Sequence, residues 1–348
     1  MRNNGGKPEV MKFLFTFLLG CSLLPVFAQQ PQFTLRRITL PKEVASADNQ
    51  FSGLFISTGT LFLMSESRLQ DHAEGKLYAV SLTDVDRQLT DSTYALPFQK
   101  LSLLNLAVLQ AKINAAGQRY EGLEALLIDG EVVYLTVETD TPSPNGYLLK
   151  GALRGDAVVL DTAFCVPLPK PVAADGSHIY NAGFEALAKS GKRLFAFFEY
   201  NSFPGNNYAY EFNKRQRTSF RTPRKRQVAQ LPFRLTDVTA GKKNHFTAIN
   251  YFFQGGGDDA VYRTPAGDLD NAKLIQQNGT YRSYSRLLDL EWKGKKFTWR
   301  PLWEFPEQYW GYNWEGIAAY RGGYFLVNDK YTPQRPYVTT LIYLQRVP

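Results

Sequence analysis

The sequence predicts an all-β fold, a single β-propeller of five blades with four antiparallel strands each. The first observation behind this prediction is a seventeen-residue unit that occurs twice without a gap, at 123–139 (LEALLIDGEVVYLTVET) and at 184–200 (FEALAKSGKRLFAFFEY). In each copy two apolar runs flank a turn glycine, which is typical of a β-hairpin. The second observation is that weaker copies recur about every 50 to 80 residues with no helical pattern between them, which favours a radial repeat over separate domains.

Acidic residues, with a serine in one case, stand at both ends of these hairpins at an interval of fourteen residues. The pairs that keep the interval are Glu124/Glu138, Glu185/Glu199, Ser52/Glu66 and Glu315/Asp329. A fifth hairpin opens at Asp237, and its second strand ends near Asn250, one residue short of the interval. Because the turn lies near the midpoint, both side chains of a pair return to the same end of the hairpin.

The remaining strand candidates complete the blades. The predicted hairpins are 51–66, 123–138, 184–199, 235–253 and 314–329. They are followed by strand candidates at 75–82, 94–104, 146–153, 156–164, 207–213, 227–233, 284–292, 296–305 and 337–347. The fifth blade then lacks one strand, which residues 31–41 (PQFTLRRITLP) can supply, so that the N-terminus closes the ring. Residues 254–283 are interpreted as a long loop, with a degenerate sixth blade as the alternative, and 101–116 as a short helix.

The N-terminus has the pattern of a secretory signal peptide. Met11 to Phe27 contains a lysine and an apolar run, and the small residue Ala28 follows. We therefore expect a signal peptide at 1–28, with Met11 as an alternative start, and a secreted or periplasmic propeller domain at 29–348. The sequence before Cys21 also resembles a lipoprotein cleavage box, which leaves anchoring at Cys21 as an alternative. The apolar run is too short and interrupted for a transmembrane helix.

Composition and charge restrict the partners. The chain has 348 residues, 44% of them hydrophobic, and a formal charge of +8, so one large core and a monomer are expected. A basic run between the third hairpin and the next strand predicts an anionic small-molecule or glycan ligand, held by Arg215, Arg217, Arg221 and Arg224. The alternative is a solvated loop. Aromatic residues are sparse in this run, so specific nucleic-acid recognition is not expected.

The first residues of the inner strands predict a metal site. If each hairpin forms the two inner strands of a blade, one set of side chains converges on the axis: Ser52, Glu124, Glu185, Asp237 and Glu315. Crowded carboxylates need a cation, and an oxygen-only donor set suits Ca²⁺. The alternative is that these acids bond backbone N–H groups and arginines of neighbouring blades. The histidines, His72, His178 and His245, show no zinc spacing.

A second set of acids closes the hairpins and should line the mouth of the same channel: Glu66, Glu138, Glu199 and Asp329. These carboxylates could bind the metal through water or act as a general base, and their spacing fits a structural role equally well.

Two short motifs resemble known families. Tyr120-Glu121-Gly122-Leu123-Glu124 and Trp314-Glu315-Gly316-Ile317-Ala318 resemble the phytase-like esterase propellers of secreted bacterial proteins. The axial series of acids is similar to that of the five-bladed calcium-activated nucleotidases (apyrases). The resemblance implies one Ca²⁺ in the central channel and hydrolysis of phosphate esters or anhydrides at its mouth.

Two function classes follow. The first is a Ca²⁺-dependent hydrolase, in which a mouth carboxylate such as Glu138 or Glu199 activates water. The second is a non-catalytic glycan- or protein-binding propeller with a structural calcium, in which Tyr312 and Trp314 stack on the ligand. For these aromatic residues, packing between blades is the alternative.

Overall fold

A computed structural model describes residues 1–2, 31–66, 75–215, 220–254, 256–329 and 339–347. The chain divides into two units, 1–30 and 31–348, and the fold described here is that of the second unit. The expected signal segment from Met11 to Ala28, with Cys21, lies outside the described residues. Among the described residues, no helix has the length and apolar character needed to cross a bilayer.

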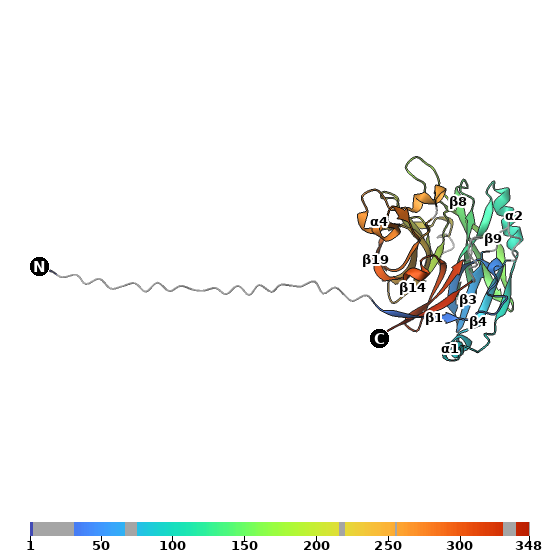
Figure 1. Cartoon of the computed structure of the whole chain (residues 1–348). Coiled ribbons are helices and arrows are strands. Elements are labelled where there is room, and N and C mark those ends of the chain that lie inside the picture. The colour runs from blue at the N-terminus through green and yellow to red at the C-terminus, as the bar shows by residue number, and fades with distance from the viewer. Residues whose placement is uncertain (3–30, 67–74, 216–219, 255, 330–338, 348) are drawn as a thin grey trace. The chain divides into compact units, whose positions relative to one another are not determined.

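The described strands form an all-β fold with one four-stranded sheet, two eight-stranded sheets and one two-stranded sheet (Figure 1). Each eight-stranded sheet consists of two antiparallel groups of four strands, and we call these groups and the four-stranded sheet blades, numbered in chain order. Blade 1 contains β2 (Phe51–Ser57), β3 (Thr60–Ser65), β4 (Lys76–Ser81) and β5 (Gln99–Leu104). Blade 2 contains β6 (Tyr120–Asp129), β7 (Val132–Thr139), β8 (Asn145–Arg154) and β9 (Ala157–Pro169). Blade 3 contains β10 (Ala186–Ser190), β11 (Arg193–Phe197), β12 (Tyr208–Asn213) and β13 (Arg224–Val228). Short parallel pairings of outer strands, β5 with β9 and β13 with β19, link neighbouring blades.

The other two blades follow the same pattern. Blade 4 contains β14 (Arg234–Ala240), β15 (His245–Phe252), β18 (Tyr284–Trp292) and β19 (Lys296–Glu304). Blade 5 contains β20 (Asn313–Tyr320), β21 (Gly323–Asp329), β22 (Leu341–Arg346) and, as its outermost strand, β1 (Phe33–Ile38). The N-terminal strand β1 pairs antiparallel with β22 over six residues, as the sequence predicts.

The first strands of the blades form the inner wall of the fold. β2, β6, β10, β14 and β20 each contact the next in this order, and β20 contacts β2. Side chains between neighbouring blades form the hydrophobic core, for example Phe195 and Phe197 of blade 3, which meet Phe297 of blade 4 at ring distances of 5.1 and 4.9 Å. This closed arrangement, in which each blade buries apolar surface against both neighbours, is that of a β-propeller.

Turn glycines make the inner hairpins tight. Gly130 and Gly191 have φ values of +65° and +56°, in the left-handed region that favours glycine. These are the turn glycines of the two strongest sequence copies, and the structure confirms both hairpins.

Several boundaries differ from the sequence prediction. Helix α2 (Leu106–Ala115) occupies only the second part of the predicted helix 101–116, because Gln99–Leu104 pairs as the outer strand of blade 1. A second helix, α1 (Leu82–Thr90), was not expected, although Ser81 caps it by accepting the N–H of Thr83. The last strand of blade 3 is β13, which includes the end of the basic run.

The predicted loop at 254–283 contains no four-stranded sheet within its described residues. It forms the 3-10 helix η2 (Gly257–Tyr262), helix α4 (Leu269–Ile275) and a hairpin of β16 (Gln276–Gln277) with β17 (Thr280–Tyr281). A further 3-10 helix, η1 (Ala47–Asn49), precedes β2, and another, η3 (Glu307–Tyr309), precedes β20.

Candidate metal centre at the channel mouth

Four of the five inner strands, β2, β6, β14 and β20, are irregular at the position where the acid or hydroxyl stands. The pairing register shifts between Phe51 and Gly53 in β2, between Leu235 and Asp237 in β14, and between Trp314 and Gly316 in β20. In β6 the register shifts between Leu123 and Leu126. The residue skipped by a bulge is freed from regular pairing and can be re-aimed. The bulges therefore turn Ser52, Glu124, Thr236 and Glu315 out of the ladder, and Glu185 stands directly before β10.

In blade 4 the position equivalent to Ser52, Glu124, Glu185 and Glu315 is occupied by Thr236 and not by Asp237, which corrects the sequence prediction. The Thr236 hydroxyl donates to the carbonyl oxygen of Trp314 at 2.6 Å, as the Ser52 hydroxyl donates to that of Leu123 at 2.6 Å. In both cases the acceptor is the residue before the next blade's glutamate. Asn250 lies fourteen residues after Thr236. Strict use of the interval would therefore have identified Thr236 from the sequence.

Asp237 instead joins neighbouring inner strands. Its Oδ1 accepts the N–H of Val238 and its Oδ2 accepts the N–H of Ile317 in blade 5, both at 2.7 Å. The residue is buried, and burial raises the pKa of its carboxyl to about 8 while these N–H groups oppose the rise. For Asp237 the structure thus favours the scaffolding alternative over metal binding.

We expect Asp237→Asn to lower the free energy of unfolding by about 1–3 kcal/mol, because an amide has one acceptor oxygen and would turn its NH₂ group toward a backbone N–H. Denaturant unfolding measures this loss, with Asp270→Asn on the exposed face of α4 as the control. Ca²⁺ affinity should not change. A normal stability together with weakened Ca²⁺ binding would instead restore Asp237 as a ligand.

Three buried glutamates meet at one point of the channel. Glu124, Glu138 and Glu185 each offer a carboxylate oxygen, and these oxygens lie within 4.8 Å of one another. The three residues are 5%, 3% and 6% exposed. Glu138 was predicted for the outer set of mouth acids, but the structure places it between two residues of the inner set.

Two glycines allow the carboxylates to approach so closely. A Cβ on residue 122 would lie 2.8 Å from Cγ of Glu66 and 2.9 Å from Oε1 of Glu124. On residue 183 it would lie 3.2 Å from Oε1 of Glu185 and 3.3 Å from Cγ of Glu138. In both places the closing acid of one blade therefore packs beside the opening acid of the next, over a glycine that leaves the space empty.

This crowding shifts the protonation of the cluster. Burial, followed by the charges of Glu199, Glu138 and Glu315, raises the pKa of Glu185 well above its usual value. Burial and the neighbouring Asp329 do the same for the pKa of Glu315. Carboxylates with raised pKa values resist ionisation until a positive charge joins them.

Arg234 supplies such a charge on the blade 3 to blade 4 side. Its guanidinium contacts Oε1 of Glu199 at 2.7 Å and Oδ1 of Asp259 at 2.8 Å, and lies 3.8 Å from the ring centre of Tyr262. The Tyr262 hydroxyl donates to Oε2 of Glu199 at 2.7 Å. Both oxygens of Glu199 are thus engaged, which leaves this predicted catalytic residue unsuited to activate water.

The predicted aromatic ligand platform is wrong for Trp314. Its side chain is fully buried, with its ring 5.4 Å from Phe305 and 5.3 Å from Tyr312, both stacked. Tyr312 is itself partly buried in this stack. These residues are core between blades 4 and 5, which was the alternative interpretation.

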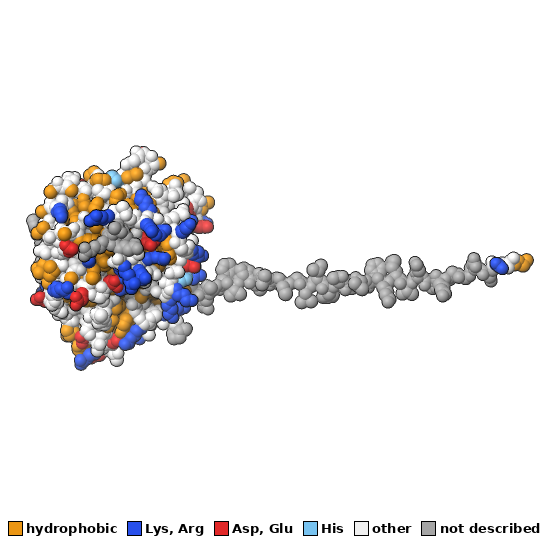
Figure 2. Space-filling model, turned by 180° about the vertical axis from the view of Figure 1, so that it is seen from behind, with side chains coloured by type: hydrophobic (Ala, Val, Ile, Leu, Met, Phe, Trp, Pro, Cys, Tyr) orange, Lys and Arg blue, Asp and Glu red, His pale blue; other side chains and the backbone are white. Residues whose placement is uncertain are grey.

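The predicted basic residues do not join the acids. Arg215 and Arg221 are exposed, Arg224 lies on the outer strand β13, and Arg217 is outside the described residues. Figure 2 shows that Lys and Arg side chains are interspersed with Asp and Glu on the face of the molecule that it presents. The described part of the run therefore fits the solvated alternative.

Three residues of the site were missed by the sequence interpretation: Arg234, Asp259 and Tyr262. Arg234 is the first residue of β14, two positions before Thr236, and the other two belong to η2 in the long loop. The one sequence signal is at Asp259, which is a charged residue close to three glycines at 255–257.

The cluster has the chemistry of a hard-cation site. The described residues that meet there offer only oxygen donors, with no histidine or cysteine in the group. Ca²⁺ binds oxygens at about 2.3–2.6 Å, so two oxygens on opposite sides of one ion lie about 4.8 Å apart. The donor set suits a hard cation such as Ca²⁺, and oxygens at most 4.8 Å apart can share one such ion.

Comparisons with known proteins give no family. No family model matches the chain, and no curated protein sequence matches it. Similar solved structures include the β-xylosidase RS223 (9% identity, TM-score 0.44, covering 90% of this chain and 98% of the other). They also include an exo-1,5-α-L-arabinanase from a bovine ruminal metagenomic library (8% identity, TM-score 0.45, 90% and 94% covered). Their similarity is too low to carry an argument about function.

Proposed function

We propose that this protein is a secreted, calcium-binding β-propeller that hydrolyses phosphate esters or anhydrides at the mouth of its central channel. The observation that carries the proposal is the meeting of Glu124, Glu138 and Glu185 within 4.8 Å in a buried position. Export rests on the N-terminal signal pattern, and the expected monomer rests on the single closed core.

The charge balance supports a bound cation. The acids at the two ends of the inner hairpins are Glu66, Glu124, Glu138, Glu185, Glu199, Glu315 and Asp329. Arg234 is already shared between Glu199 and Asp259. Lys170 is also buried, donates to the carbonyl oxygens of Thr139 and Asp140, and acts electrostatically on Glu138 and Glu185. The acids outnumber these two cations, so a divalent cation among the glutamates would stabilise their ionised form.

The residues have distinct roles in this proposal. Glu124, Glu138 and Glu185 would hold Ca²⁺, which polarises a phosphoryl oxygen when bound. Asp329 and Glu315 are partly exposed, so the blade 5 side is where a substrate would reach the cluster. Asp329, or the neighbouring Glu66, is then placed to take a proton from water as general base.

A non-catalytic binding propeller with a structural calcium is the second candidate. The specific observation in its favour is the deep burial of the three central glutamates, each 6% exposed or less. Such an ion would hold blades 2 and 3 together at the axis without meeting a substrate.

An assay of phosphomonoesters, nucleoside diphosphates and nucleoside triphosphates, with Ca²⁺ or with a chelator, separates the two candidates. A hydrolase should show chelator-sensitive turnover, and Asp329→Asn should lower kcat by about 10²–10⁴-fold because a general base is lost. Glu307→Gln, on the exposed η3, is the control. If Ca²⁺ binds but no substrate is turned over, the hydrolase is excluded and the structural calcium remains.

A further inference from the structure

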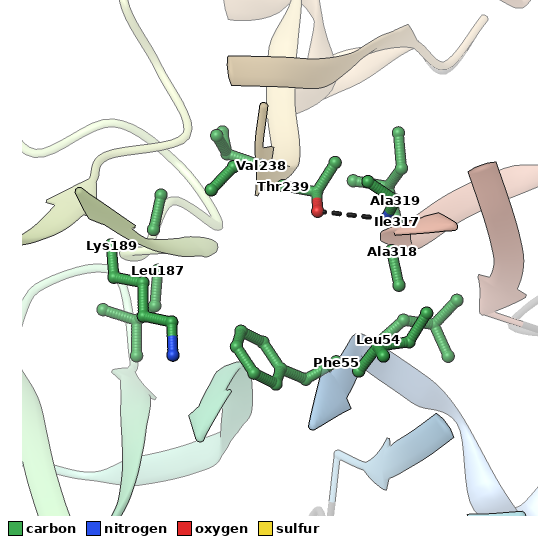
Figure 3. Close-up of a pocket in the computed structure, with 12 residues that line it drawn as sticks. Leu54, Phe55, Leu187, Lys189, Val238, Thr239, Ile317, Ala318 and Ala319 are labelled. Carbon is green, nitrogen blue, oxygen red and sulfur yellow. Dashed lines mark hydrogen bonds between the residues drawn. The ribbon is translucent and has the colours of Figure 1, made fainter. Parts of the chain in front are cut away.

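A cavity lies further along the inner strands than the glutamates, toward the hairpin turns. Its volume is about 200 Å³. Four inner strands each contribute three consecutive residues to its wall: 54–56 of β2, 187–189 of β10, 238–240 of β14 and 317–319 of β20. Figure 3 shows Lys189 on one side of this turn-end pocket, Ala318 and Ala319 across from it, and Phe55 along the edge between them.

The walls are mostly apolar and are held in place by contacts between the strands. Small side chains, Ala188, Ala240, Ala318 and Ala319, leave the space open. The Thr239 hydroxyl accepts the N–H of Ala319 at 3.1 Å and so ties β14 to β20 across the wall (Figure 3). A preformed cavity of this kind binds an apolar group without first reorganising.

One cationic group stands in this apolar wall. The ammonium of Lys189 donates to the carbonyl oxygen of Ile128 at 3.2 Å and to Oδ1 of Asp129 at 3.1 Å, and lies 5.6 Å from the ring centre of Phe55. An ammonium has three donors, so these contacts leave one for a ligand. Asp129 also pairs with Lys214, which gives the group of two lysines and one aspartate a net positive charge.

Exposed lysines on the adjoining turns add to the positive potential. Lys192 lies in the turn of blade 3, and Lys242 and Lys243 lie in the turn of blade 4; all are exposed. The acids on the turn of blade 2, Asp129 and Glu131, pair with lysines and with an arginine. The excess of lysines attracts small anions to the cavity.

We propose that the turn-end pocket is a second ligand site, which binds a small carboxylate carrying a single aromatic ring or a branched aliphatic group. The apolar walls take the body of the ligand and Lys189 takes its carboxylate by a charge-assisted hydrogen bond. The volume of the turn-end pocket is sufficient for one aromatic ring, because an engineered cavity of about 150 Å³ holds benzene. The site is independent of the metal centre, since it shares none of the glutamates.

The test uses benzoate and its neutral analogue benzamide, titrated into the full chain by calorimetry. We expect saturable benzoate binding that is about tenfold tighter than benzamide binding, because only benzoate forms the charged contact. Lys189→Met should weaken benzoate about tenfold and leave benzamide unchanged. Asp129 keeps Lys214 as its partner in this variant, so folding should be preserved.

Two blocking variants locate the binding. Ala319→Phe and Ala240→Phe add a ring at exposed residues of the pocket, and each should reduce benzoate affinity at least about tenfold by filling the space. Ala116→Phe, at the exposed end of α2, is the matched control and should bind normally. The proposal is overturned if benzoate does not bind, or if it binds both blocking variants as it binds the unaltered chain.

Discussion

Replacing Glu185 by glutamine is expected to weaken Ca²⁺ binding by about 100-fold or more. Glu185 offers one of the three carboxylate oxygens that lie within 4.8 Å of one another, and the amide removes its negative charge from that group. Changes to groups that only support metal ligands already weaken binding about 10–100-fold, and loss of a direct ligand should do at least as much. Calorimetric titration of Ca²⁺ into the metal-free protein measures the change, with Glu307→Gln as the control.

In the metal-free protein, Glu185→Gln should increase stability, although it weakens Ca²⁺ binding. Burial and neighbouring acids raise the folded-state pKa of Glu185 above its ordinary value of 4.5. A group with a raised pKa contributes stability that is fully present below its unfolded-state pKa and is lost as pH rises through the folded value. The free energy of unfolding of the metal-free protein should therefore fall as pH rises above about 4.5. That of Glu185→Gln should fall less over the same range.

These two effects distinguish a metal site from a packed acid. If Glu185→Gln lowers the stability of the metal-free protein and leaves Ca²⁺ affinity unchanged, the carboxylate serves as a hydrogen-bonding scaffold and the calcium assignment is wrong.

Replacing Arg234 by methionine is expected to lower the free energy of unfolding by about 3–5 kcal/mol. The guanidinium holds Glu199 at 2.7 Å and Asp259 at 2.8 Å, and the Glu199 side chain is only 3% exposed. Removing one partner of a buried ion pair leaves the other charge buried and uncompensated, which is much less favourable than removing both. Denaturant unfolding in the presence of a chelator isolates this effect from metal binding.

A double variant tests whether the loss of stability in Arg234→Met is caused by the uncompensated charge of Glu199. Arg234→Met combined with Glu199→Gln should recover most of the lost stability, because the remaining amide can still accept the Tyr262 hydroxyl. Arg154→Met is the matched control, since its pair with Glu131 is exposed and should change stability by less than about 1 kcal/mol. A double variant no more stable than Arg234→Met alone would show that the arginine acts through packing on Tyr262 and not through charge.

The hairpins and their acids were predictable because both follow local rules. Turn glycines such as Gly130 and Gly191 mark the midpoint, and an even interval returns the two acids of a hairpin to one end. The closing strand β1 could be found because the fifth blade lacked one strand. Asp237 was misassigned because an acid was preferred over Thr236, although the threonine keeps the interval.

Contacts between blades could not be predicted in the same way. Arg234 pairs with Asp259, which belongs to the long loop of blade 4, and no repeat in the sequence indicates this contact. An aromatic side chain such as Trp314 can face either a ligand or a neighbouring blade. Its stacking on Phe305 shows that it belongs to the core. Grouping Glu138 with Glu124 and Glu185 likewise depends on how blades 2 and 3 meet at the axis.

An anomalous difference map from crystals grown with Ca²⁺ would examine the metal centre directly. We expect one peak on the channel axis, within about 2.3–2.6 Å of carboxylate oxygens from Glu124, Glu138 and Glu185. A map with no peak between these residues at saturating Ca²⁺ would contradict the calcium site and, with it, the proposed hydrolase.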